Sequence, residues 1–317
     1  MNGNATDSAA SHEVRQVPIE RAICADYAQF RSAIKRRGEP LIVSGILDGW
    51  PARKWSPQYF KTKWGGLPFT PSVDLPTSGR PYEQIWANYH RKMTLGEFVD
   101  LLESAEKPCY VRRQLVERFP GAEAELDFER MFPRDDTGVD NTFIWFGVNT
   151  LTPLHFDLSD GVLCQMHGRK RVFLLGPGDS ARLYPYPQSV TKSPVLPHQP
   201  DYGSFPRFRD ATLFVGSIGP GDLLYTPRRW WHSIIAEGVS ISVSHEFGES
   251  VSYGDIASAI SARGALGWLV FARDFVWCGM LGRTGPRRLF DDPPFGALVY
   301  GILAGAVKRR LPALTRQ

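Results

Sequence analysis

Between residues 141 and 247 the chain consists of short runs of β-branched and aromatic residues that glycine and proline repeatedly interrupt. The runs are NTFIWFGVNT, GVLCQMH, KRVFLLG, ATLFVGS, DLLYTP, HSIIA and VSISVSHEF, and CYVRRQL precedes them from Cys109. Runs of this length and composition predict strands rather than helices. About eight strands joined by turns indicate a sandwich or a barrel, so we predict a mainly β fold.

Helical patterns flank this β region on both sides. The segment Ile19–Val43 has a helical period, and PLIVSGILDGWPARKWSPQYFKTKWGG predicts a buried strand, a turn and a helix capped by Ser56. MTLGEFVDLLES predicts another helix, with Thr94 as its cap. Beyond Ser250 an alanine-rich stretch returns to the helical period, and a last helix is expected from Phe295 to about Arg310.

These patterns divide the chain into four parts. We expect a disordered tail over residues 1–15, a helical and stranded region flanking the core over 16–140, the β core over 141–250 and a helical region over 251–317.

Charge and cysteine content bear on partners and compartment. The formal charge of +4 comes from 37 basic and 33 acidic residues spread along the chain, which gives no clear support for nucleic-acid binding. The four cysteines lie far apart without a C-x-x-C pair, so we predict neither a thiolate zinc site nor a disulfide framework and expect a cytoplasmic location. The apolar stretch FGALVYGILAGAV is shorter than the roughly 20 residues of a membrane span, so no span is expected.

The densest chemical signal is the segment TPLHFDLSD. Side chains alternate along a strand, so His155 and Asp157 are predicted to project to one side and to share a metal ion. His232 is the best candidate for a third ligand, because neighbouring strands of a sandwich are often far apart in sequence. His167 and His245 lack the spacing to join them. A lone H-x-D pair also arises by chance in a chain with seven histidines.

Two histidines and one carboxylate form the facial triad of non-haem Fe(II) oxygenases, which leaves three coordination positions open for a bidentate co-substrate and dioxygen. Zinc would favour tetrahedral closure with more histidine or cysteine ligands. The residue types therefore favour iron over zinc.

The segments TPLHFDLSDGVLCQMHGRKRVFLLGPGDSARLYP and GPGDLLYTPRRWWHSIIAEGVSISVSHEF resemble the JmjC and cupin-like family of Fe(II)- and 2-oxoglutarate-dependent oxygenases, and specifically its small hydroxylase branch. The resemblance extends more loosely from Pro40 to about Phe247. It implies a double-stranded β-helix, which is a jelly-roll core with the metal at its open mouth and helices packed around it.

The resemblance assigns roles to individual positions. His155, Asp157 and His232 match the iron ligands, and Thr152 and Lys170 match the residues that hold the far carboxylate of 2-oxoglutarate. A dicarboxylate buried in an apolar barrel independently demands a cation, which Lys170 can supply from the start of the strand KRVFLL.

Three more residues match positions near the co-substrate. Tyr110 matches a tyrosine that in some relatives donates its hydroxyl to the same carboxylate, and a core tyrosine is the alternative interpretation. Ser244 matches a small polar residue near the keto-acid end, and Gln165 matches an inward amide, for which an ordinary strand glutamine is the alternative. Gly161 departs from the family, whose members often carry asparagine there, so we expect an altered pocket that remains active.

Two surfaces complete the prediction. The loop SPVLPHQPDYGSFPRF is expected at the mouth of the barrel with His198 exposed. The predicted substrate lip consists of this loop with Tyr184, Tyr186, Tyr202, Phe205 and Arg207. The C-terminal helices are similar in position to the helical pair through which related hydroxylases dimerise, so a homodimer is expected.

The resemblance implies a dioxygenase that hydroxylates a protein side chain or a small molecule while converting 2-oxoglutarate to succinate. Histone demethylation is disfavoured, because neither a zinc-binding cysteine set nor a basic chromatin tail accompanies the core. Two alternatives remain open. One is a non-catalytic cupin-like binding module, and the other is a zinc cupin acting as an isomerase or hydrolase, in which Lys170 would have no obvious role.

Overall fold

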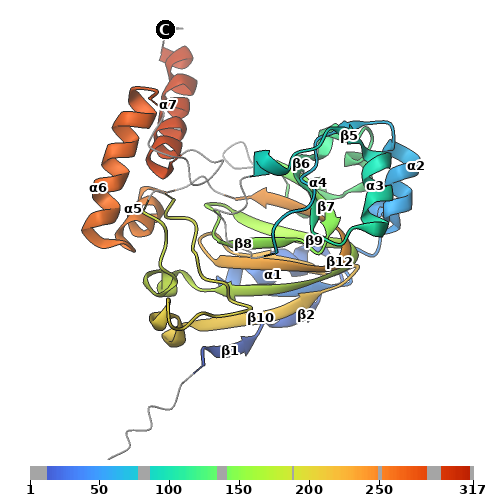
Figure 1. Ribbon diagram of the computed structural model, residues 1–317, viewed down its shortest axis with the longest axis horizontal. Helices are drawn as coiled ribbons and strands as arrows, with labels where there is room; N and C mark the ends of the chain where they lie inside the picture. Colours follow the sequence, from blue (N-terminus) through green and yellow to red (C-terminus); the bar gives the residue numbers. More distant parts are fainter. Residues whose placement is uncertain are drawn as a thin grey trace, which may run out of the picture.

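A computed structural model describes residues 13–77, 86–133, 141–187, 189–248, 252–283 and 294–314 of the chain. Its centre is a ten-stranded mixed sheet arranged as a jelly roll with flanking helices (Figure 1), which confirms the predicted fold class. The strands of this sheet are β1 (Arg15–Pro18), β2 (Arg21–Ile23), β3 (Leu41–Ser44), β6 (Cys109–Leu115), β7 (Asn141–Val148), β8 (Leu151–His155), β9 (Asp160–Leu175), β10 (Thr212–Ile218), β11 (Leu223–Thr226) and β12 (Trp231–Phe247). A separate pair consists of β4 (Pro68–Phe69) and β5 (Met93–Thr94).

The helices lie around this sheet. The α-helices are α1 (Tyr27–Arg37), α2 (Pro57–Trp64), α3 (Leu95–Ser104), α4 (Phe128–Met131), α5 (Tyr253–Ser261), α6 (Gly264–Asp274) and α7 (Phe295–Leu314). A π-helical segment, Phe275–Met280, continues α6. Short 3-10 helices occupy Pro51–Lys54, Trp86–Tyr89, Val116–Arg118, Glu123–Glu125, Pro177–Leu183 and Pro206–Asp210.

Two long strands, β9 and β12, form the centre of the sheet and pair along most of their length. Each bends once, so that GVLCQMH and KRVFLLG are two halves of one strand, as are HSIIA and VSISVSHEF. At the bend of β9, Gly168 has φ +72°, and a Cβ there would lie 2.1 Å from the carbonyl oxygen of Val239. Only glycine allows this approach, which is why a sequence break at Gly168 does not end the strand.

Strands from the N-terminal region complete the sheet. β1 pairs in parallel with β10, and β2 pairs in parallel with β3, which in turn lies beside β11. The predicted helix over Ile19–Val43 is therefore wrong at its start, where β2 forms, because sheet pairing overrides the local pattern. At its end the buried strand predicted from Pro40 is present as β3, and only α1 is helical. The boundary expected at residue 141 separates segments of sequence but not of structure, since β6 also pairs with β7.

The predicted disordered tail ends too late. Val14 is buried and its backbone N–H donates to the hydroxyl of Tyr202 at 2.9 Å, and Arg15 begins β1. Residues 1–12 lie outside the described part of the chain.

The flanking helices begin where the sequence predicts. Ser56 accepts a hydrogen bond from the backbone of Tyr59 at the start of α2, and Thr94 forms a capping box with Glu97 at the start of α3. The apolar faces of both helices are buried, and Phe60 and Phe98 meet Phe146 of β7 edge to face.

The C-terminal helices pack on one another beyond the sheet (Figure 1), and α5 and α7 bury Ile256 and Phe295 in the same core cluster as Leu154 of β8. α6 and its π-helical continuation pack against α7, where a Cβ at Gly296 would lie 2.5 Å from the carbonyl oxygen of Phe271. Among the described residues, none of the helices has the length and apolarity that crossing a bilayer requires.

Candidate metal centre

His155 and His232 face each other across two neighbouring strands. His155 ends β8, His232 lies at the start of β12, and the two are direct partners in the antiparallel register. Directly opposed residues project to one face of a sheet, so the imidazole centroids lie 4.2 Å apart. Sheet pairing thus brings together two side chains that are far apart in sequence.

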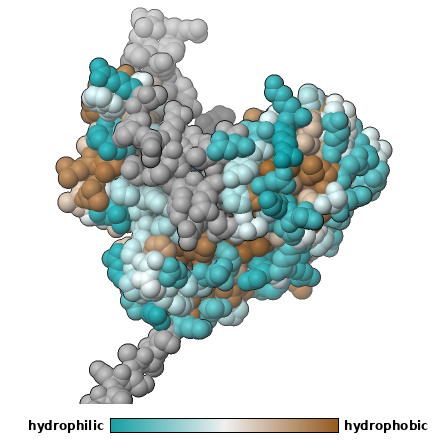
Figure 2. All heavy atoms as spheres, viewed as in Figure 1, coloured by the Kyte–Doolittle hydropathy of each residue, from teal (hydrophilic) through white to brown (hydrophobic). Residues whose placement is uncertain are grey.

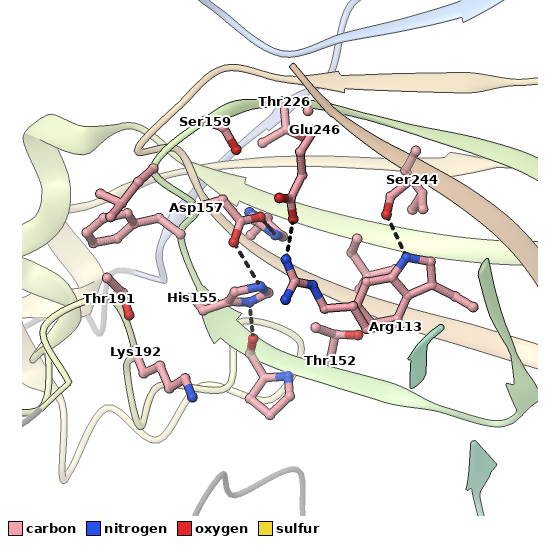
Figure 3. Close-up of a pocket in the computed structure, with 18 of the residues that line it drawn as sticks. Arg113, Thr152, His155, Asp157, Ser159, Thr191, Lys192, Thr226, Ser244 and Glu246 are labelled. Atoms are coloured by element: carbon pink, nitrogen blue, oxygen red, sulfur yellow. Dashed lines mark hydrogen bonds and ion pairs between the residues drawn. The ribbon is translucent and has the colours of Figure 1, made fainter. Parts of the chain in front are cut away.

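Asp157 joins the two histidines from a loop. The strand ends at His155, so the predicted alternation along one strand is not what places the carboxylate. Its oxygens lie 3.9 Å from Nε2 of His155 and 3.6 Å from Nε2 of His232 (Figure 3). One ligand atom from each of the three residues fits within 4.8 Å of the others, which is close enough for one metal ion to bridge them.

The backbone fixes which nitrogen each histidine presents. Nδ1 of His155 lies 2.8 Å from the carbonyl oxygen of Pro153, and Nδ1 of His232 lies 3.1 Å from that of Trp230. A carbonyl can only accept, so both Nδ1 atoms carry the proton and both Nε2 atoms keep a lone pair toward Asp157. This backbone support of a ligating imidazole is typical of metal sites.

The protonation states suit a cation. Burial and the neighbouring His232 lower the pKa of His155 to about 4, so its imidazole is neutral at neutral pH. Burial opposes the ionisation of Asp157, but His155, His232 and Arg113 outweigh it and hold the pKa of the carboxyl below its usual value. The centre therefore offers the neutral imidazole of His155 and the carboxylate of Asp157 beside Nε2 of His232.

A β-bulge explains how Thr152 reaches the same cavity. In a regular strand Thr152 and His155, three residues apart, would point to opposite faces. The register instead shifts between His232 and Ile234 of β12, which pair with His155 and Thr152, so β8 holds one extra residue there. Pro153, which has no N–H to donate, occupies this bulge.

Lys170 lines the same cavity as the metal ligands. The volume of this cavity is about 540 Å³. It is 4% exposed, whereas its neighbours Arg169 and Arg171 are exposed, as the alternation of β9 predicts. Burial lowers the pKa of Lys170 to about 7, and no charged side chain in the described part of the chain offsets this effect. A buried ammonium group facing a cavity needs an anionic partner.

Tyr110 and Ser244 also line this cavity. Tyr110 is buried on β6 and hydrogen-bonds with Thr152 and Thr150, and burial raises the pKa of its hydroxyl to about 12, so the hydroxyl keeps its proton. The hydroxyl of Ser244 accepts a hydrogen bond from Nε1 of Trp145 at 2.7 Å (Figure 3). The structure therefore brings seven of the eight predicted residues to one cavity.

Gln165 is the exception. It is fully buried and absent from the cavity lining, and its amide nitrogen donates to His167, Gly168 and Ser240. Its amide oxygen accepts a hydrogen bond from Ser242 at 2.6 Å. These bonds hold the bend of β9 and leave the amide nothing to offer a ligand, so the alternative of an ordinary strand glutamine describes its position.

The residues of the predicted substrate lip do not line the cavity either. Tyr184, Tyr202 and Phe205 pack against a core cluster instead of the cavity, and His198 is half-buried rather than exposed. The segment between β9 and β10, to which the predicted lip belongs, instead contributes Ser189, Thr191 and Lys192 to the lining of the cavity.

Several lining residues had no recognisable signal in the sequence. The lining includes Arg113, which pairs with Glu246 at 2.9 Å (Figure 3), and Phe295, Leu298 and Ile302 of α7. An arginine in a basic strand and apolar residues in a C-terminal helix suggest a solvated face and a packing face. Only the tertiary arrangement directs them toward the metal ligands.

Gly161 leaves open space on the cavity wall. A Cβ at this position would meet no atom closer than 3.9 Å, the carbonyl oxygen of His245. The absence of a polar side chain therefore enlarges the cavity and removes one contact without disturbing the ligands.

The donor set fits a divalent first-row metal. Two imidazoles and one carboxylate on one side of an ion are the ligands of the facial triad, and backbone carbonyl oxygens orient both imidazoles. The fold and this centre together define a jelly-roll protein with a two-histidine, one-carboxylate metal site beside a buried lysine.

Comparison with known proteins agrees with this class. The chain belongs to the cupin-like domain family, which matches residues 27–252. Lysine-specific demethylase 8 of Xenopus tropicalis is 29% identical over 238 residues, which are 72% of this chain and 52% of that protein. Jumonji C domain-containing protein 5 of Drosophila melanogaster is 23% identical over 231 residues, 68% of this chain and 56% of that protein.

A third relative has a name that points to a different process. tRNA wybutosine-synthesizing protein 5 of Mus musculus is 24% identical over 248 residues, which are 73% of this chain and 78% of that protein. The chain spans only about half the length of the demethylase and Jumonji C relatives. The matched region contains the metal ligands and Lys170.

Proposed function

We propose that this protein is an Fe(II)- and 2-oxoglutarate-dependent dioxygenase that hydroxylates a protein side chain or a small molecule and releases succinate. One observation carries the proposal: three side chains placed to bind one metal ion share a cavity with a buried lysine that has no charged partner among the described residues. Bound iron would supply the activation of dioxygen, and the protein supplies binding, orientation and charge balance.

Each residue has a distinct task in this proposal. His155, Asp157 and His232 would hold the iron on one side. Lys170, assisted by the hydroxyls of Thr152 and Tyr110, would bind the far carboxylate of 2-oxoglutarate. The apolar residues Leu163, Leu224 and Ile234 line the cavity and would exclude water from this ion pair.

The alternatives explain less of the site. Burying the charge of a lysine is unfavourable in free energy, and a non-catalytic binding module has no need to retain such a lysine beside two oriented imidazoles. A zinc isomerase or hydrolase gives Lys170 no task.

An anaerobic titration tests the proposal. Fe(II) followed by 2-oxoglutarate should produce a weak visible charge-transfer band, because the keto group and near carboxylate would chelate the iron. Succinate, which lacks the keto group, is the matched control and should produce no band. If saturating 2-oxoglutarate also gives no band, the proposed function is wrong, and both alternatives predict that outcome.

The substrate is proposed only by class. A cavity of about 540 Å³ suits a side chain or a small metabolite together with the co-substrate. Measuring succinate release with peptide pools and with metabolite pools distinguishes the two.

Four cysteines, none of them in a disulfide, support a cytoplasmic location.

We further propose a homodimer through the C-terminal helices. Figure 2 shows apolar atoms gathered over α6, where Leu269, Val276 and Met280 form an exposed stripe at helical spacing along α6 and its continuation. Exposed stripes of this kind favour burial against a second copy.

A double substitution tests the dimer. Leu269→Asp with Met280→Asp should halve the mass found by sedimentation velocity, because two carboxylates cannot be buried in an apolar interface. Ile23→Asp, at an exposed apolar residue on β2, is the control and should leave the mass unchanged. An unchanged mass in the double variant contradicts this interface.

A further inference from the structure

The turn that precedes His232 has an unusual residue. Residues 227–230 connect β11 to β12, with the N–H of Trp230 donating to the carbonyl oxygen of Pro227 at 3.1 Å. Within this turn Arg229 has φ +66°, a left-handed conformation that a long side chain rarely adopts. Strained backbone of this kind persists where surrounding contacts impose it, and it often accompanies a functional site.

The backbone of this turn is bonded to the segment that carries the carboxylate ligand. The N–H of Arg229 donates to the carbonyl oxygen of Asp157 itself at 2.8 Å. The N–H of Arg228 donates to the side chain of Asp160 at 2.8 Å. The turn therefore joins the loop of Asp157 to the strand of His232, three residues after Arg229.

The side chain of Arg229 extends away from the metal ligands to α5. Its guanidinium donates to a carboxylate oxygen of Asp255 at 3.2 Å and to the hydroxyl of Ser258 at 2.5 Å. Asp255 is buried and is fixed by Ser252, whose hydroxyl donates to its other oxygen at 2.7 Å. A single residue thus connects the backbone of a metal ligand with the first turns of a C-terminal helix.

The turn itself does not require arginine. Glycine adopts φ +66° without strain, and the bond to Asp157 uses only the backbone N–H. What arginine adds is the contact with α5. In Figure 1 α5 lies at the edge of the sheet, and α6 and α7 extend beyond it. The contact therefore adds a polar link to the apolar packing of Ile256 and Phe295 in the core cluster of Leu154 and Phe156.

We propose that Arg229 is a positioning residue, which braces the loop of Asp157 against α5 and so sets the metal affinity of the centre. The inference rests on the metal centre of the proposed function. It also makes metal affinity sensitive to the placement of the C-terminal helices.

Two substitutions in the full-length protein test the contact between Arg229 and Asp255. Arg229→Gly keeps the backbone conformation and removes the side chain, and Asp255→Asn keeps the shape of its partner and removes the charge. Mn(II) binding, measured by the loss of the free-ion electron paramagnetic resonance signal, should weaken about tenfold in each, which is the usual effect of losing such support. The double variant should bind no more weakly than Arg229→Gly alone, because that change already removes the contact with Asp255 together with the bond to Ser258.

Arg228→Ala is the matched control. Its guanidinium lies 3.7 Å from Asp255, and its side chain is 38% exposed, so Mn(II) affinity should change less than about twofold. Arg229→Lys should recover part of the lost affinity, because an ammonium group can reach the same carboxylate. Recovery by a charge-conserving change separates positioning from simple packing.

The outcomes distinguish this inference from the proposed function. If the wild-type protein binds Mn(II) and Arg229→Gly binds it equally well, Arg229 is not a positioning residue, while the metal centre stands. If the wild-type protein binds no Mn(II), the metal centre itself fails. If the metal-free variant unfolds at a much lower urea concentration and Arg229→Lys recovers nothing, the role is structural and the inference is overturned.

Discussion

Replacing Asp157 with alanine is expected to abolish both metal binding and turnover of 2-oxoglutarate. Asp157 supplies the one anionic ligand of the centre, and without it two neutral imidazoles would have to hold a dication alone. Loss of an outer contact already costs 10- to 100-fold in metal affinity, so loss of this ligand should cost more than about a hundredfold. Mn(II) binding and succinate release measure the two effects separately.

Asp48→Ala is the control for this substitution. Asp48 is an exposed aspartate outside the cavity lining, so its loss should leave both measurements unchanged. An Asp157→Ala variant that converts 2-oxoglutarate to succinate at the wild-type rate would contradict the assignment. His232→Ala should have the same effect as Asp157→Ala, because the two remaining ligands cannot hold a metal ion in facial coordination.

Replacing Lys170 with methionine should raise the dissociation constant of 2-oxoglutarate about a hundredfold and leave Mn(II) binding nearly unchanged. The ammonium group is the buried cation of the cavity, and loss of one partner of a buried ion pair costs about 3 kcal/mol or more. Methionine fills a similar volume, so the barrel should remain packed. Calorimetric titration of the metal-loaded protein measures the change.

The same substitution should stabilise the protein when no co-substrate is present. The pKa of Lys170 is about 7 in the folded protein, against 10.5 for an ordinary lysine. Between these values the unfolded chain binds more protons, so stability rises with pH across this window, and the cost of burying the charge is complete below about pH 7. Lys170→Met should remove this slope and add on the order of a few kcal/mol at neutral pH.

Urea unfolding on both sides of this pH window checks the second effect. Arg169→Met, a neighbouring change on the exposed face of β9, should alter neither the pH profile nor 2-oxoglutarate binding. A Lys170 variant that is less stable than wild type at neutral pH would show that the ammonium group has a partner within the fold. Opposite effects on stability and binding are expected where function maintains an unfavourable buried charge.

Local patterns predicted many elements well. Ser56 and Thr94 mark the starts of α2 and α3, because capping depends on a few neighbouring residues. The composition also predicts the strands from Cys109 to Phe247 other than β8, except that the bends at Gly168 of β9 and Gly238 of β12 resemble strand ends. The helical period of Ile19–Val43 fails at the start of the segment, because β2 pairs there with β3, which is itself held by β11 from the far end of the β core.

The site shows the same division. The H-x-D pair and His232 identify a metal centre, yet Asp157 lies beyond the strand that was expected to place it. The bulge that turns Thr152 and His155 to one face depends on the register of β8 with β12. Gln165 matches a position near the co-substrate, with an ordinary strand glutamine as the alternative, and no local pattern shows which amide the bend of a strand will use.

The sequence by itself determined the kinds of chemical group and the order in which the chain presents them: two imidazoles, one carboxylate, one lysine and strands of alternating polarity. Tertiary structure alone decided that β12 lies against β8, that α7 lines the cavity and that Arg229 reaches α5. The reason is physical. Alternation and capping act over a few residues, whereas register and helix placement depend on burying surfaces that are distant in sequence, and only the folded chain brings those surfaces together.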